Sequence, residues 1–294
     1  MTNLVLGIDG GGSTCRAALA DPSGRIIGRG TSGPANILTD PEEAVLHIGE
    51  AAREAFSAAG TDPALVSSTP CYLGLAGSTV PRAVDAVVQR LPFQESVVES
   101  DGLIALEGAL GDMDGSIAIL GTGTIYFLKT GSQVETVGGW GFVIGDLGSG
   151  ARIGQAAMQE SILAEDGIRN RTPLTDSLIG AFGEVSALVD FARNAAPADF
   201  ARFAPSIFER ADTGDATALR VIRQAAHHVD EALDRLFDLG GPLPLCLLGG
   251  LAPSYRRWVS ERHRVRLREP AADAVSGAVS LAIRHFVTRQ GAAA

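Results

Sequence analysis

The sequence predicts an α/β protein built from two related domains. An apolar strand, a turn of glycine and hydroxyl residues, and a second apolar strand follow one another in LVLGIDGGGSTCRAAL, and the same design returns in IAILGTGTIYFL. A third apolar run, LPLCLLGGLA, also ends in glycines late in the chain. We interpret the repeat as an internal duplication. It predicts domains at residues 1–113 and 114–294, with packing of the last helix back onto the first domain as an alternative.

The first half alternates short strands with helices. Apolar runs predict strands at 3–9, 15–20 and 25–30, with Asp21–Gly24 as a turn between the last two. Residues 40–60 then predict a helix, because Asp40 can cap it and Pro41 suits its first position. Further along, the sequence predicts a strand followed by a glycine turn within 71–77, a short helix at 80–91, a strand at 95–100, and a helix beginning at Asp101.

The second half repeats this plan with longer helical stretches. The strand pair lies within 115–131, and a late strand with glycines lies at 243–252. Helices are expected near 150–166, 174–194, 215–239 and 271–288.

Composition excludes several classes of protein. A net charge of −10 argues against a nucleic-acid partner, because binding a phosphate backbone needs a basic face. The three cysteines are scattered, which argues against a disulfide framework and a zinc site. The sequence shows no signal peptide and no uncharged apolar run of about 18 residues, so we expect a cytoplasmic protein without a membrane span.

The glycine turns predict binding of a nucleotide phosphate. Successive backbone N–H groups unobstructed by Cβ atoms bind anions without side-chain charge, which suits an acidic protein. An ordinary tight hairpin is the alternative for any one such turn, and neither a P-loop motif nor a dinucleotide-binding βαβ unit is present. The expected nucleotide-binding residues are Gly10, Gly11, Gly12, Ser13 and Thr14, then Gly121, Thr122, Gly123 and Thr124, and finally Gly249 and Gly250.

These motifs resemble those of the ASKHA superfamily, and within it the BadF/BadG/BcrA/BcrD ATPase family, which includes N-acetylglucosamine kinases. The matching segments are GIDGGGST, GPANIL, GLAGS, SDG, GTGT, GGWGFVIGDLGSGARIG and LLGGLA. Two more stretches, LAEDGIRNRTPL and PADFARFAPSIF, are most similar to bacterial glucosamine kinases. The resemblance spans the chain and implies two ribonuclease H-like domains with a nucleotide and sugar cleft between them.

The resemblance also implies roles for particular residues. Asp101 is expected to be the general base for the sugar hydroxyl, although an aspartate there would also serve as a helix N-cap. Asp9 is expected to contact Mg²⁺ through water. Asn36 and Asp146 are expected to bind the sugar, Gly123 to lie beside both substrates, and Trp140 either to pack on a sugar face or to fill the core. Asn36 suits this role because an amide offers a donor and an acceptor together.

The predicted function is ATP-dependent phosphorylation of an amino sugar at its 6-hydroxyl, with glucosamine favoured and N-acetylglucosamine as the alternative. An activator of a radical dehydratase would need cysteine ligands for an iron–sulfur cluster, which three dispersed cysteines do not supply. A non-catalytic sugar sensor is the third hypothesis, but the DNA-binding segment of repressor relatives is not expected where so few residues precede the first strand. The family resemblance implies ATP and Mg²⁺ as cofactors and a homodimer formed through the second domain.

Overall fold

The computed structural model describes residues 4–288, and its internal packing divides the chain into two units. Unit 1 combines the residues up to Met113 with those from Pro270 onward, and unit 2 spans Asp114–Glu269. The last helix of the described chain therefore packs in unit 1, together with the first half of the sequence.

Unit 1 is built on a five-stranded sheet in the order β3-β2-β1-β4-β5. The strands are β1 (Val5–Gly10), β2 (Cys15–Ala20), β3 (Ile26–Ser32), β4 (Cys71–Leu75) and β5 (Ser96–Ser100). The first three strands are antiparallel, whereas β4 and β5 run parallel to β1. The helices are α1 (Pro41–Ala58), η1 (Pro63–Ser68), α2 (Pro81–Val88), α3 (Asp101–Leu110), α12 (Ala274–Ala282) and the π-helical η2 (Ile283–Thr288).

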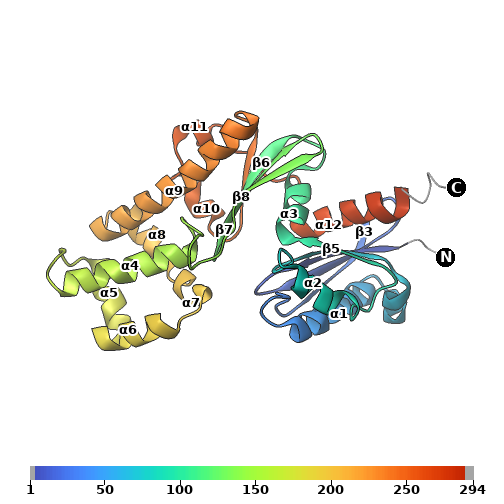
Figure 1. Ribbon diagram of the computed structural model, residues 1–294, viewed down its shortest axis with the longest axis horizontal. Coiled ribbons are helices and arrows are strands. Elements are labelled where there is room, and N and C mark those ends of the chain that lie inside the picture. Colours follow the sequence, from blue (N-terminus) through green and yellow to red (C-terminus); the bar gives the residue numbers. More distant parts are fainter. Residues whose placement is uncertain (1–3, 289–294) are drawn as a thin grey trace. The chain divides into compact units, whose positions relative to one another are not determined.

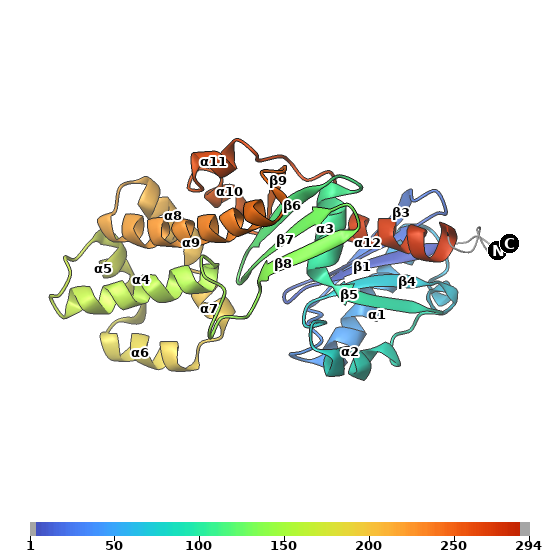
Figure 2. The same cartoon turned by 45° about the horizontal axis from the view of Figure 1, so that its top comes forward.

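Helices cover both faces of this sheet (Figures 1 and 2). On one face α1 packs against Leu6 and Ile8 of β1, and on the other α12 packs near Val5 of the same strand. The alternation follows from the two-residue period of a strand. Helix α1 begins as the sequence predicts, because the Asp40 side chain accepts hydrogen bonds from two N–H groups of the first turn and Pro41 follows it.

Glycines let α12 lie very close to its neighbours. A Cβ atom on Gly277 would lie 2.1 Å from the carbonyl oxygen of Ile104 in α3, and one on Gly108 would lie 2.2 Å from the carbonyl oxygen of Asp273. A Cβ atom on Gly7 of β1 would lie 2.5 Å from the amide nitrogen of Val279. Since these neighbours are backbone atoms, the contacts leave no space for a side chain at any of the three glycines.

Unit 2 carries a four-stranded sheet in the order β8-β7-β6-β9. Its strands are β6 (Gly115–Leu120), β7 (Thr124–Thr130), β8 (Gln133–Gly138) and β9 (Leu245–Leu248). Its helices are α4 (Gly150–Glu165), α5 (Pro173–Phe182), α6 (Val185–Asn194), α7 (Pro197–Ala201), α8 (Ala204–Asp212), α9 (Ala216–Gly240), α10 (Ala252–Tyr255) and α11 (Glu261–Arg264).

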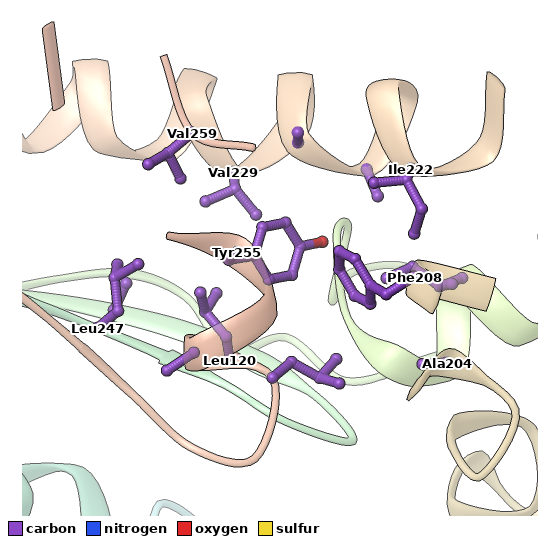
Figure 3. Packing of buried hydrophobic residues seen from close by; sticks show 14 of the residues in the cluster. Leu120, Ala204, Phe208, Ile222, Val229, Leu247, Tyr255 and Val259 are labelled. Carbon is purple, nitrogen blue, oxygen red and sulfur yellow. The ribbon is translucent and has the colours of Figure 1, made fainter. Parts of the chain in front are cut away.

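The core of unit 2 surrounds the fully buried ring of Tyr255 (Figure 3). The ring meets Phe208 edge to face, with 5.1 Å between the ring centroids, and lies between Val229 of α9 and Leu120 of β6. Its hydroxyl donates to the carbonyl oxygen of Gly148, because a buried tyrosine needs a partner for its polar end. This single side chain therefore joins the helical layer to the segment that follows β8.

The two α/β units predicted from the sequence are confirmed, with several differences in detail. The helix expected at 174–194 is two helices, α5 and α6, because Gly183 adopts φ of +81° between them. Strand β8 and the short helices α7, α8, α10 and α11 were not predicted. Across residues 4–288 no helix is long and apolar enough to cross a membrane.

Candidate functional site

In unit 1 the two predicted carboxylates lie at the carboxyl edge of the sheet. Asp9 in β1 pairs in register with Gly74 in β4, which pairs in turn with Glu99 in β5. Asp101 begins α3 two residues after Glu99. Only β4 lies between β1 and β5, and adjacent strands lie about 4.8 Å apart. The two carboxylates therefore come from nearby positions along the sheet edge. Ligands of open parallel sheets bind at this edge.

Asp9 is buried, with 6% of its surface exposed, and forms an ion pair with Arg16 on the neighbouring strand β2. Register explains the pair, because Asp9 and Arg16 are direct cross-strand partners. Burial raises the pKa of Asp9, the Arg16 guanidinium opposes that effect, and the negative charge of Asp273 adds to it. The structure thus holds a carboxylate in a desolvated position with one cation beside it.

Asp101 is accessible to solvent and carries a perturbed carboxyl group. Partial desolvation by the surrounding protein raises its pKa, and the negative charge of Asp9 raises it further. The N–H of Gly102 donates to Oδ1 at 2.9 Å and opposes both effects. The capping role considered for Asp101 belongs to Ser100, whose hydroxyl accepts from the N–H of Leu103, so the Asp101 carboxylate is not required as the N-cap of α3.

The glycines of the first turn differ in the space around them. A Cβ atom on Gly10 would lie 2.6 Å from Cδ2 of the buried Leu75, so that side chain would have to shift. A Cβ atom on Gly11 would meet only the Thr14 carbonyl oxygen, at 3.4 Å, and one on Gly12 would meet nothing within 4 Å. Neither residue has positive φ. Together with the exposed Ser13 and Thr14, these two residues leave open space at the tip of the turn.

Asn36 lies next to this turn because backbone hydrogen bonds hold its segment in place. The N–H of Ala35 donates to Gly11, and the N–H of Ile37 donates to Ala76 after β4. The Asn36 side-chain oxygen accepts from the N–H groups of Leu38 and Thr39. The acceptor expected to meet a sugar is therefore already engaged, and the amide NH₂ remains as a donor. Residues Gly12 and Asn36 both line a cavity of about 160 Å³.

In unit 2 the second glycine turn contacts the start of α4. The N–H of Gly150 donates to the Gly121 carbonyl oxygen at 2.8 Å, and the N–H of Ala151 donates to Thr122 at 3.3 Å. A Cβ atom on Gly121 would meet nothing within 4 Å, and Thr122 is exposed. Thr124 differs from Thr122, because it is 4% exposed and its hydroxyl donates to the Leu147 carbonyl oxygen at 3.1 Å.

The third glycine segment lies beside this turn at the end of β9. The N–H of Leu251 donates to the carbonyl oxygen of Leu120, the residue that precedes Gly121. Gly249 has φ of +87°, and a Cβ atom there would lie 2.5 Å from that same carbonyl oxygen. Gly250 again has nothing within 4 Å. Two of the predicted nucleotide-binding segments are thus adjacent in unit 2, and each carries one open glycine.

Residues 139–148 form a loop that brings Asp146 to the second turn. A Cβ atom on Gly123 would lie 2.8 Å from Oδ2 of Asp146. Partial burial raises the pKa of Asp146, while N–H groups of Thr124 and Gly141 oppose that effect. Trp140 is 78% exposed, so the alternative that it fills the core is wrong. The N-cap of α4 is Ser149, so the Asp146 carboxylate is not needed to cap that helix.

Sequence reasoning missed Arg16 and Arg152. The alternation of β2 contained a signal for the first, because a cross-strand partner of Asp9 could be counted from the hairpin. For Arg152 no local signal exists, since its guanidinium donates to carbonyl oxygens of residues 143 and 145, whose positions depend on the loop conformation.

Comparison with known proteins identifies the relatives of this chain. Residues 6–282 match the model of the BadF/BadG/BcrA/BcrD ATPase family. The chain is 34% identical over 282 residues to the glucosamine kinase GspK of Vibrio cholerae, covering 95% of this chain and 96% of the relative. It is 27% identical over 275 residues to the N-acetyl-D-glucosamine kinase of Dictyostelium discoideum, covering 84% of this chain and 85% of the relative.

Solved structures give a consistent result. A Chromobacterium violaceum protein proposed to be an N-acetylglucosamine kinase superposes with a TM-score of 0.88 at 30% identity, covering 96% of this chain and 99% of its own. A ROK-family glucokinase from Streptomyces griseus, solved with glucose and AMPPNP, superposes with a TM-score of 0.55 at 22% identity, covering 98% of this chain and all of its own. The second likeness concerns the fold alone.

Proposed function

Because the chain belongs to the BadF/BadG/BcrA/BcrD ATPase family, we propose that it is an ATP-dependent kinase that phosphorylates an amino sugar at the 6-hydroxyl, with glucosamine as the preferred substrate. The observation that carries this proposal is the pair of carboxylates at the sheet edge of unit 1, Asp9 and Asp101, each with a raised pKa. Perturbed carboxyl groups at a ligand-binding edge favour a catalytic role over a structural one.

Asp101 is the proposed general base. Its carboxylate accepts the proton of the sugar hydroxyl as that oxygen bonds to the γ-phosphorus of ATP and the bond from phosphorus to the ADP oxygen breaks. A raised pKa strengthens the carboxylate as a proton acceptor, provided that it stays ionised at the working pH. The α3 helix, capped by Ser100, fixes the position of this carboxylate.

The open glycines are the proposed phosphate contacts. In unit 1 the N–H groups around Gly11 and Gly12, with the hydroxyls of Ser13 and Thr14, supply donors. In unit 2 the turn at Gly121–Gly123 supplies further donors, and Gly250 lets a nucleoside approach the end of β9. We assign no phosphate contact to the side chain of Thr124, because its hydroxyl already donates to Leu147.

Asp9 fits a magnesium site of the type that the family resemblance implies. Mg²⁺ usually keeps several waters and takes one or two carboxylates together with phosphate oxygens. Asp9 supplies a buried carboxylate, and within residues 4–288 no three histidine, cysteine or acidic side chains gather as a cage for a metal. When bound, the ion would neutralise phosphate charge. Arg16 holds one oxygen of Asp9 and leaves the other available.

Substitution of the open glycine in the first turn tests the nucleotide assignment. Gly12→Ala is expected to leave the unfolding midpoint unchanged and to raise the KM for ATP about tenfold, because a methyl group would obstruct backbone donors worth roughly 1.5 kcal/mol to a charged ligand. Gly10→Ala is the matched contrast, and it should lower the unfolding midpoint because of the contact with Leu75. An unchanged KM for ATP in Gly12→Ala would contradict the assignment.

A substrate panel tests the sugar. Glucosamine, N-acetylglucosamine and glucose are supplied with ATP and Mg²⁺, and ADP release is measured. We expect kcat/KM to be highest for glucosamine, since an acidic residue such as Asp146 can pair with its 2-ammonium group. No ADP release above background with any of the three sugars would refute the proposed function.

N-acetylglucosamine is the second candidate substrate. The Dictyostelium discoideum relative carries that name, and the Chromobacterium violaceum structure is proposed to have that activity. A higher kcat/KM for the acetylated sugar would select this candidate. The dehydratase-activator hypothesis has no comparable support, because the thiols of Cys15, Cys71 and Cys246 are all buried within strands.

A further inference from the structure

The 139–148 loop that carries Asp146 has an unusual backbone, in which several residues adopt positive φ. Gly139, Gly141 and Gly148 have φ between +75° and +84°, and Asp146 has φ of +53°. Among residues 4–288, Asp146 is the only residue other than glycine with positive φ. An aspartate tolerates this left-handed region better than most residues but still needs surrounding contacts to hold it.

Arg152, in the first turn of α4, supplies those contacts. Its Nε donates to the Gly145 carbonyl oxygen at 3.0 Å, and one terminal nitrogen, Nη2, donates to the Val143 carbonyl oxygen at 3.4 Å. The other, Nη1, donates to Oε1 of Gln155 at 3.1 Å. The guanidinium also lies over the ring of Phe142, 5.1 Å from its centroid. One side chain thus contacts three successive parts of the loop just before Asp146.

The backbone of Arg152 is itself held in place by hydrogen bonds. The hydroxyl of Ser149, which is fully buried, accepts from the N–H of Arg152, and the start of α4 is bonded to the second glycine turn. On the far side, Phe142 stacks on Phe200 with 5.5 Å between ring centroids. Burial raises the pKa of Asp146, and the positive charge of Arg152 acts in the opposite direction.

We propose that Arg152 is a positioning residue for the sugar: it fixes the 139–148 loop so that the carboxylate of Asp146 is held beside Gly123 before substrate arrives. The inference rests on the proposed function for the identity of the substrate. It assigns to Arg152 a role in sugar affinity and not in phosphoryl transfer, because its donors are occupied by protein acceptors.

The planar guanidinium suits this task. It presents several donors in fixed directions and stacks on an aromatic ring, whereas a lysine offers one compact ammonium group and cannot do both. Arg152→Lys should therefore recover part of the function that Arg152→Gln loses. Arg220 of α9 is the matched control, because it lines the same 410 Å³ cavity as Arg152 but pairs with Glu160 and, within residues 4–288, forms no hydrogen bond or ion pair with the 139–148 loop.

Steady-state kinetics provide the first test. Arg152→Gln should raise the KM for the sugar substrate about tenfold, which corresponds to a loss of roughly 1.4 kcal/mol of binding free energy through lost preorganisation. Both kcat and the KM for ATP should stay nearly unchanged. Arg152→Lys should give an intermediate KM, and Arg220→Gln should match the parent protein. Equal changes in both KM values, or no change in either, would overturn the assignment.

Fluorescence provides a test that does not need activity. The chain has two tryptophans, Trp140 in the loop and Trp258 elsewhere in unit 2, so Trp258→Phe leaves Trp140 as the sole reporter. Arg152→Gln in that background should lower the Trp140 anisotropy, while Arg220→Gln should not. An unchanged anisotropy would contradict a positioning role even if no sugar were phosphorylated. Failure of the proposed function would instead appear in the parent protein as absence of turnover.

Discussion

Asp101→Asn is expected to lower kcat for sugar phosphorylation by about 10²–10⁴-fold, the range that a positioned general base contributes, while the KM for ATP stays close to that of the parent protein. The amide can still accept the N–H of Gly102, so the start of α3 should keep its geometry. Ser100, which caps the helix, is untouched. Steady-state kinetics with the best sugar of the panel measure both constants. Asp85→Asn, an exposed carboxylate on α2, serves as the control and should leave both unchanged.

The raised pKa of Asp101 adds a pH dependence and a stability effect with definite signs. Partial desolvation and the Asp9 charge raise this pKa, so kcat/KM should fall on acidification through an apparent pKa above 3.8.

The raised pKa of Asp101 also affects stability, because the folded state binds the proton more tightly than the unfolded state does. Ionisation of Asp101 therefore lowers the free energy of unfolding as the pH rises through this range. At neutral pH Asp101→Asn should therefore be more stable than the parent protein. An active Asp101→Asn enzyme would refute the assignment.

Gly277→Ala is expected to lower the free energy of unfolding of unit 1 by about 3 kcal/mol, at the upper end of the usual cost of overpacking. The added Cβ atom would lie 2.1 Å from the Ile104 carbonyl oxygen and 2.5 Å from the Gly108 amide nitrogen. Both neighbours are backbone atoms, so no side-chain rotation relieves the clash and α12 has to move away from α3. Urea denaturation followed by circular dichroism measures the change.

Gly180→Ala is the matched control for this prediction. Gly180 also lies within a helix, α5, but a Cβ atom there would meet nothing within 4 Å. Alanine should stabilise the protein there by up to about 1 kcal/mol, because it restricts the unfolded chain and favours the helix. Equal free energies of unfolding for Gly277→Ala and Gly180→Ala would contradict the close packing of α12 against α3.

Much of the fold could be predicted because its local signals agree with its packing. Asp40 and Pro41 mark the start of α1, and the glycine turns mark the ends of β1 and β6. The split between α5 and α6 could not be recognised from apolar spacing alone, since that spacing continues across Gly183 and only the backbone angle ends the helix. Strand β8 was missed because its side chains are mostly exposed and give no apolar alternation.

The candidate site was predictable wherever the motif itself places the residue. Strand order brings Asp9 and Asp101 to one sheet edge, and that order follows from the alternation of strands and helices. The hydrogen-bond partners of each side chain were not predictable in the same way. The engaged oxygen of Asn36 and the donated hydroxyl of Thr124 depend on segments that meet only after folding. The contacts of Arg152 with the 139–148 loop are of the same kind.

On the proposed role of Asp146 in binding the sugar, the left-handed backbone at residue 146 restricts how the sugar preference can change. Branched side chains such as valine or isoleucine are strongly disfavoured at φ of +53°, whereas asparagine and glycine are tolerated. Neutralising the charge at this position is therefore conformationally accessible in one step, through asparagine. Replacing it with a bulky apolar group first requires the backbone to be rebuilt. New substrate ranges should thus arise more readily at neighbouring positions such as Trp140, whose side chain is solvent-facing and unconstrained in this way.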